Sequence, residues 1–142
     1  MLGAWIRGWW RRLRRGPAGI GAAGEAAAAD FLRREHGFRV LARNWRHGRD
    51  ELDLVCLDGG VLVFVEVKTR AAGALVGGYE AVDARKKRAL RRAALAYLVR
   101  LDAPPVAYRF DVVEVRHRDG RSVELHHFEN IPLFGPHHHR AG

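Results

Sequence analysis

Two charged side chains, Glu66 and Lys68, interrupt an apolar and largely β-branched stretch of the sequence. Because side chains alternate between the two faces of a strand, Glu66 and Lys68 point to one side while Val63, Val65 and Val67 point to the other. A carboxylate and an ammonium group on one face are suited to binding a cation and to stabilising negative charge on a phosphate.

A second carboxylate, Asp53, is predicted to lie opposite Glu66. If a two-residue turn forms at Gly59-Gly60, the register of the resulting hairpin pairs Asp53 with Glu66. Directly opposed side chains have Cβ atoms about 4.5–5.5 Å apart, and two carboxylates at that separation repel unless a cation or a proton lies between them. The pair therefore suits Mg²⁺, with Lys68 placed to orient a water or stabilise a phosphate. A three-residue loop would shift this register.

The alternative is a solvated hairpin face on which Lys68 pairs across the strands with Glu51. Two features favour a functional site instead. Phe64 should share the charged face, which argues against full solvation. Glu25 is in phase with the apolar side of a predicted helix over residues 22–36, and a carboxylate facing a sheet is costly unless it is paired.

The elements that would position these groups follow from periodicity and turn residues. They are helices over residues 22–36 and 83–101, and strands over residues 38–44, 52–57, 61–68, 109–115 and 122–128. The order helix, three strands, helix, two strands predicts an α/β fold in which helices flank a central mixed β-sheet. A loop containing three glycines is expected over residues 71–78.

The length of 142 residues predicts one main domain, which we place at residues 21–134. Residues 1–20 form a basic, Trp/Arg-rich extension, which fits an amphipathic membrane-surface helix, a nucleic-acid-binding arm or a segment of arbitrary composition. Residues 135–142 are expected to be a disordered tail, and no function is assigned to its three histidines. The single Cys56 reads as a buried thiol, and with no membrane-spanning run a cytoplasmic location is expected.

The net charge of +9 is concentrated, since residues 85–92 hold six Lys or Arg and no acid. Such a field favours polyanions, and nucleic acid is the commonest of these; the alternative is a solvated helix face. Lys86 leans toward the buried edge of its helix, from which it either reaches a phosphate or snorkels to solvent. The predicted nucleic-acid-binding residues are Arg70, Lys86, Lys87, Arg88 and Arg91.

Several motifs occur in a fixed order: Gly24-Glu25, Arg43-Asn44, Glu51-Leu52-Asp53-Leu54, residues 64–70, Lys86, and Arg109-Phe110-Asp111-Val112-Val113. Over about residues 21–134 the chain resembles the YraN family of small bacterial proteins. That family resembles the PD-(D/E)XK nuclease superfamily, and within it the archaeal-type Holliday junction resolvases.

The resemblance implies a restriction-endonuclease-like sandwich that hydrolyses phosphodiester bonds with Mg²⁺ or Mn²⁺ and uses no small-molecule cofactor. It implies that Asp53, Glu66 and the carbonyl oxygen of Val67 bind the metal, that Lys68 is the catalytic lysine, and that Glu25 is an accessory catalytic carboxylate. The implied partner is DNA, branched or otherwise distorted, and a homodimer is expected. The competing interpretation is a non-catalytic nucleic-acid-binding module that keeps the nuclease fold.

Two residues depart from the related patterns. Leu52 stands where the superfamily has proline, and Asp50 stands where the family usually has glycine, which adds an acid next to the site. Elsewhere, Asp111 lies in an apolar strand and is expected to hold an arginine. The remaining histidines considered, His117, His126 and His127, lack a spacing that indicates zinc.

Overall fold

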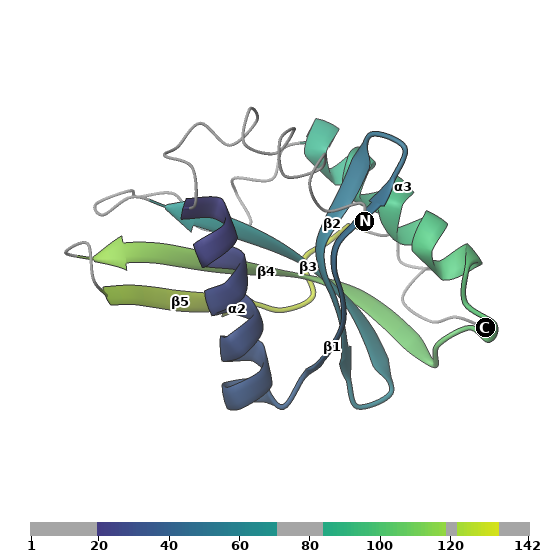
Figure 1. Cartoon of the computed structure of the whole chain (residues 1–142). Coiled ribbons are helices and arrows are strands. Elements are labelled where there is room, and N and C mark those ends of the chain that lie inside the picture. The colour runs from purple at the N-terminus through teal and green to yellow at the C-terminus, as the bar shows by residue number, and fades with distance from the viewer. Residues whose placement is uncertain (1–19, 71–83, 119–121, 134–142) are drawn as a thin grey trace.

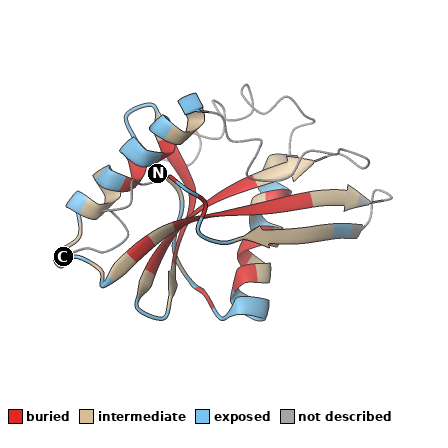
Figure 2. Cartoon of the chain, turned by 180° about the vertical axis from the view of Figure 1, so that it is seen from behind, coloured by how far each residue is buried: buried red, intermediate tan, exposed pale blue. Residues whose placement is uncertain are grey.

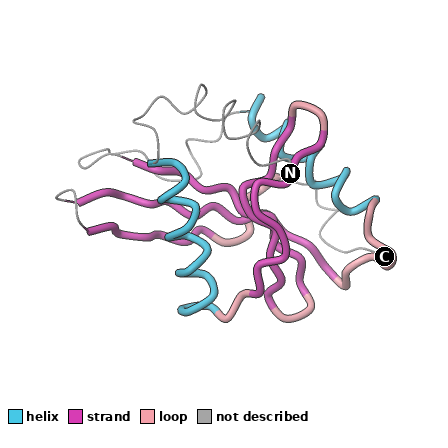
Figure 3. Tube along the Cα trace, in the orientation of Figure 1, coloured by secondary structure: helices cyan, strands magenta, loops and turns pink. Residues whose placement is uncertain are grey.

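We describe the protein from a computed structural model, which defines the positions of residues 20–70, 84–118 and 122–133. The elements are α2 (Ile20–His36), β1 (Arg39–His47), β2 (Asp50–Asp58), β3 (Val61–Arg70), α3 (Ala84–Val99), β4 (Ala107–Arg118) and β5 (Ser122–Phe128). This confirms the predicted order and the α/β class, with strands longer than predicted at most ends (Figure 3). The expected extension, the glycine-containing loop and the tail lie outside the described residues.

The five strands form one mixed sheet in the order β1-β2-β3-β4-β5. All neighbouring strands are antiparallel except β3 and β4, which are parallel. Parallel neighbours need a crossover connection, and α3 lies in the connection between these two strands. The two helices cover opposite faces of the sheet (Figure 1).

Each helix packs on its own cluster of buried side chains. On one face α3 contributes Leu90, Ala93 and Ala94 to a cluster with Val55 and Phe64. On the other face the small residues of α2 let the helix approach the sheet closely, and the cluster there contains Ala28, Ala29, Leu32, Val63, Val65 and Val67. Because both faces are covered, β2 and β3 are buried along most of their length (Figure 2).

The alternation predicted for β3 is confirmed by these clusters. Val63, Val65 and Val67 face α2, whereas Phe64 faces α3. Glu66, two residues beyond Phe64, is therefore on the α3 side of the sheet. The fold thus brings the charged face of β3 against the helix that carries the basic residues.

Helix α2 ends at His36 with a defined cap. Gly37 has a φ of +67°, in the left-handed region that favours glycine, and the backbone N–H of Phe38 donates to the carbonyl of Leu32 at 3.0 Å. The turn sends the chain directly into β1. Within the described residues, neither helix is long and apolar enough to cross a membrane.

Candidate functional site

Glu66 is buried on β3, with 1% of its surface exposed. Its Oε1 atom lies 3.4 Å from Lys68 Nζ and 3.5 Å from Lys86 Nζ. A buried carboxylate is costly without a compensating charge, and the two ammonium groups supply it. The lysine side chains are 25% and 28% exposed, so an anion from solvent can reach both.

Lys86 reaches this position from the first turn of α3, the helix in the crossover connection between β3 and β4. The sequence placed it at the buried edge of its helix with two open interpretations, a phosphate contact or a snorkelling lysine. Its contact with Glu66 shows that its ammonium group is directed into the candidate site.

Asp53 is fully buried on β2, the strand next to the one that carries Glu66. The paired residues of β2 and β3 run from Asp58 opposite Val61 to Leu54 opposite Val65, which is the register predicted from the two-residue turn. Beyond that last pair, Asp53 Oδ2 accepts the backbone N–H of Val67 at 2.8 Å. One oxygen of Asp53 is thus fixed against the strand that carries Glu66.

The regular alternation of β2 breaks at Asp53. Leu54 belongs to the cluster under α2, and strict alternation would place Leu52 there too, but Leu52 belongs to the cluster under α3. On β1, Asn44 lies at the level of Asp53 and has a φ of +50°, in the left-handed region. Irregular backbone in two neighbouring strands accompanies the turning of Asp53 toward the backbone of β3.

Asn44 links α2 to the start of β2. With its amide oriented to satisfy its neighbours, its nitrogen donates to Glu25 Oε2 at 2.9 Å and to Glu51 Oε1 at 3.2 Å. Glu25 therefore faces the sheet, as its helical phase predicted. This hydrogen-bonded group is joined to the candidate site through β2, because Glu51 lies two residues before Asp53 on that strand.

The basic residues of α3 gather in its first half. Arg85, Lys86, Lys87 and Arg88 precede the apolar residues that anchor the helix, and its last turn holds no basic residue. Cations in the first turn oppose the helix dipole and do not stabilise the helix. Of the predicted DNA-binding residues on this helix, Arg88 and Arg91 are exposed. Arg70, the predicted DNA-binding residue outside α3, is the last residue of β3.

The added acid at Asp50 is paired. Arg92 donates from Nε to Asp50 Oδ2 at 2.9 Å and from its terminal nitrogen to Asp50 Oδ1 at 3.0 Å, a two-bond contact from α3 to β2. The hydrogen bond to Asp50 raises the pKa of Arg92. Since the charge of Asp50 is offset locally, it does not stand as an isolated acid at the edge of the site.

Sequence reasoning missed the roles of two residues here, Asn44 and Arg92. Asn44 stood in a motif without a role, because its role depends on a left-handed backbone that brings two carboxylates to one amide. Arg92 was interpreted only as a phosphate-binding or solvated residue, and its pairing with Asp50 was missed because the two residues are 42 positions apart in the sequence. An Asn inside a strand pattern was the one available signal, since Asn tolerates the left-handed region.

A family model described as "Uncharacterised protein family UPF0102" matches residues 24–115. The chain belongs to this family. UPF0102 is the YraN family whose motifs the sequence resembles, so that resemblance is confirmed. The matched residues include Glu25, Asp53, Glu66, Lys68 and Lys86.

Curated UPF0102 relatives cover most of the chain. The protein is 54% identical to a UPF0102 protein of Symbiobacterium thermophilum over 96 residues, which are 68% of this chain and 80% of that relative. It is 44% identical to one from Chlorobaculum parvum over 117 residues, 81% and 90% of the two chains. It is 50% identical to one from Mycolicibacterium gilvum over 116 residues, 80% and 94% of the two chains.

Proposed function

We propose that this UPF0102 protein is a metal-dependent nuclease that hydrolyses phosphodiester bonds in DNA, with branched or distorted DNA as its substrate. One observation carries the proposal. Two buried carboxylates on neighbouring strands, Asp53 and Glu66, lie at the end of the hairpin pairing, and Lys68 and Lys86 are both directed at Glu66.

The donor atoms fit a hard divalent cation such as Mg²⁺ or Mn²⁺. Asp53 and Glu66 offer carboxylate oxygens, and Val67, whose N–H is bonded to Asp53, offers a carbonyl oxygen. Mg²⁺ is commonly held by one or two carboxylates, with water and phosphate oxygens completing its shell. Such an ion would polarise the phosphate and favour deprotonation of the attacking water.

Charge balance supports the same substrate class. The two carboxylates are offset by the ammonium groups of Lys68 and Lys86, so a divalent cation would leave the group with two excess positive charges. A phosphodiester, which gains negative charge as water attacks, would offset them. Lys68 is suited to stabilise that charge, and Glu25, held by Asn44, is assigned as the accessory carboxylate.

The basic first half of α3 supports DNA as the carrier of that phosphate. Its cations gain no stability from the helix dipole, whereas a phosphate backbone would gain from both the cations and the dipole. Lys86 connects this surface to the site, because it belongs to the same helix and contacts Glu66. Lys87, Arg88 and Arg91 would position DNA through its backbone.

The test is cleavage of an end-labelled four-way DNA junction and of its linear arms, with Mg²⁺ or Mn²⁺. The wild-type protein should cut the junction, and Asp53→Asn and Glu66→Gln should each lower the rate at least about a hundredfold. Both substitutions keep side-chain shape and remove one ligand charge. Thermal unfolding of each variant shows whether the fold is kept.

Glu35→Gln is the matched control, because Glu35 is an exposed carboxylate near the C-terminal end of α2, whereas Glu25 lies near the N-terminal end of that helix. It should cut like the wild type. Cleavage that persists in folded Asp53→Asn and Glu66→Gln proteins would overturn the proposed site.

A non-catalytic nucleic-acid-binding module is the second candidate, and the concentration of cations on α3 favours it. It predicts binding of the junction without any cleavage dependent on a divalent ion. It also predicts that Asp53→Asn and Glu66→Gln leave the binding affinity unchanged or increase it, because they remove negative charge.

A further inference from the structure

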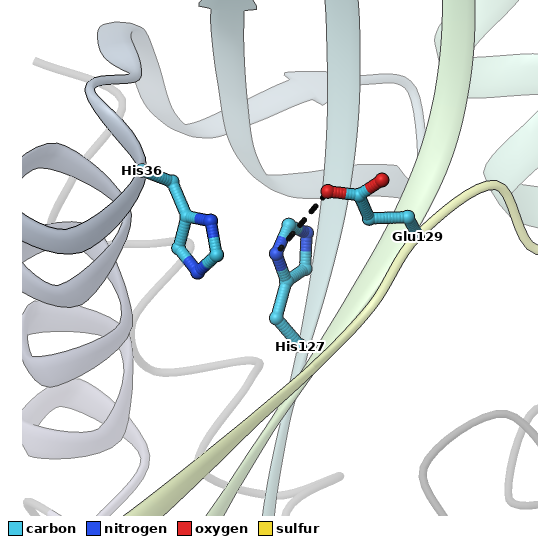
Figure 4. A group of neighbouring side chains, drawn as sticks. All are labelled: His36, His127 and Glu129. Carbon is cyan, nitrogen blue, oxygen red and sulfur yellow. Dashed lines mark ion pairs between the residues drawn. The ribbon is translucent and has the colours of Figure 1, made fainter.

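A second cluster of ligand side chains lies at the other end of α2. His36 at the helix C-terminus, His127 on β5 and Glu129 just beyond β5 each bring one ligand atom to within 4.8 Å of the others. Figure 4 shows the His36 ring beside the His127 ring, with the Glu129 carboxylate approaching His127. Glu25 is three turns away along the same helix, about 16 Å, so this cluster is distinct from the site at Asp53 and Glu66.

We propose that His36, His127 and Glu129 form a binding site for a transition-metal ion, with Zn²⁺ as the preferred occupant. Two imidazoles and one carboxylate are the ligand set of a three-ligand zinc site, whose fourth position is filled by water or a small ligand. Mixed nitrogen and oxygen donors favour Zn²⁺ over Mg²⁺ or Ca²⁺, which prefer oxygen.

The buried histidine of the cluster is oriented by a buried carboxylate. His127 Nε2 lies 2.8 Å from Asp111 Oδ2, and the two side chains are 4% and 0% exposed. Donation from Nε2 to Asp111 leaves Nδ1 as the acceptor nitrogen, and Nδ1 is the atom that lies 4.0 Å from Glu129 Oε1. A carboxylate that fixes the tautomer and raises the basicity of a ligand histidine is a recurring second layer in zinc sites.

Asp111 is itself firmly held. Burial would raise its pKa, but hydrogen bonds from His127 and Arg109 and from the backbone of Asn130 lower it overall. Arg109 is shared between Asp111 and Asp58, at 3.0 Å from each, so its charge is offset on both sides.

The segment carrying Glu129 is fixed by the same carboxylate. The N–H of Asn130 donates to Asp111 Oδ1 at 2.9 Å, and the next residue, Ile131, donates to the carbonyl of Phe110 at 2.7 Å. Asn130 has a φ of +54°, which turns the chain immediately after Glu129. Asp111 therefore positions two of the three ligands, one through its side chain and one through the backbone.

The two exposed ligands can close on an ion without moving the backbone far. A tetrahedral zinc site needs ligand atoms about 3.3 Å apart. His36 and Glu129 are exposed, and the His36 ring already lies edge-on to the His127 ring, with centroids 4.8 Å apart. His36 also lies in the last turn of α2, where the helix dipole favours a cation.

The test is calorimetric titration of Zn²⁺ into the full chain carrying His137→Ala, His138→Ala and His139→Ala, which removes the three consecutive histidines of the tail as competing ligands. The parent should bind Zn²⁺ at one tight site. In that background His36→Ala and Glu129→Ala should each raise the Kd about tenfold or more. Bound Co²⁺ should show the visible absorption of a tetrahedral ion in the parent and lose it in His36→Ala.

His126→Ala is the matched control. His126 is the neighbour of His127 on β5. In the strand register His126 lies opposite Glu114 of β4, whereas His127 lies opposite Val113, whose side chain is on the α2 side of the sheet. It should leave the Kd unchanged. An unchanged Kd in His36→Ala and Glu129→Ala would overturn the proposal, as would loss of the tight site in Asp53→Asn, which would place the ion at Asp53 and Glu66 instead.

Discussion

The Cys56 thiol lies fully buried on β2, in the cluster beneath α2. Burial, reinforced by the negative charge of Asp111, raises its pKa to about 12. Only about one thiol in ten thousand would then be ionised at pH 8, and the thiolate is the reactive form. The raised pKa and the burial of the thiol therefore both lower the reactivity of Cys56.

We expect iodoacetamide at pH 8 to modify native Cys56 at least about a hundredfold more slowly than the urea-unfolded chain. Mass spectrometry of quenched samples measures both rates, and the chain provides its own control because it has a single cysteine. Equal rates would mean that the thiol is accessible in the folded protein.

At the scale of single residues, the register of the hairpin that carries Asp53 and Glu66 was predictable from Asp58 to Leu54, because a two-residue turn fixes it. The direction of Asp53 was not, since it depends on the break in alternation between Leu52 and Leu54. The cluster containing His127 was also missed. His36 and His127 are 91 residues apart, so the sequence contains no short ligand spacing that would indicate a site formed by α2 and β5.

Among the elements, α2 lies close against β3 at Gly24. A Cβ atom added there would lie 2.3 Å from Thr69 Oγ1, well inside the closest normal contact, and 3.6 Å from Thr69 Cβ. Glycine inside a helix ordinarily costs about 0.5–1 kcal/mol relative to alanine. Its presence here is explained by the hydroxyl on the facing strand.

Gly24→Ala should therefore destabilise the protein by about 1 kcal/mol or more in the wild-type background, because Thr69 must shift. In a Thr69→Ala background the same substitution should be stabilising by up to about 1 kcal/mol, as expected for an unobstructed helix. Urea denaturation of the four proteins gives the coupling free energy. Additive effects of the two substitutions would show that the close contact does not govern stability.

Element order and strand pairing were largely predictable, because apolar runs, alternation and turn residues all indicated the same elements. Strand ends were less so. The strand predicted over residues 109–115 extends over Ala107–Arg118, since pairing with β3 and β5 continues beyond its apolar part.

For the whole molecule, the net charge of +9 predicts that the proposed binding to DNA is sensitive to salt. Each phosphate contact contributes about −0.9 to the slope of log K against log salt for duplex DNA. If Lys87, Arg88 and Arg91 each contact one phosphate, replacing all three with alanine should reduce the magnitude of the slope by about 2 to 3.

Fluorescence anisotropy with a labelled duplex between low and moderate salt measures both slopes. Arg33→Ala with Arg34→Ala is a control for charge removal, since both arginines are exposed in the last turn of α2. An equal loss of slope per removed charge in that double variant would indicate a diffuse field in place of a specific α3 surface.

The ion pair between Lys86 and Glu66 also links the site to the order in which the chain assembles. Asp53, Glu66 and Lys68 belong to one hairpin, a local structure that closes over a short loop. Lys86 arrives only when the crossover helix docks. A local opening that releases α3 would therefore leave the hairpin paired but remove one of the two charges that compensate Glu66. Hydrogen exchange at the first turns of α3 would then report on the integrity of the site itself.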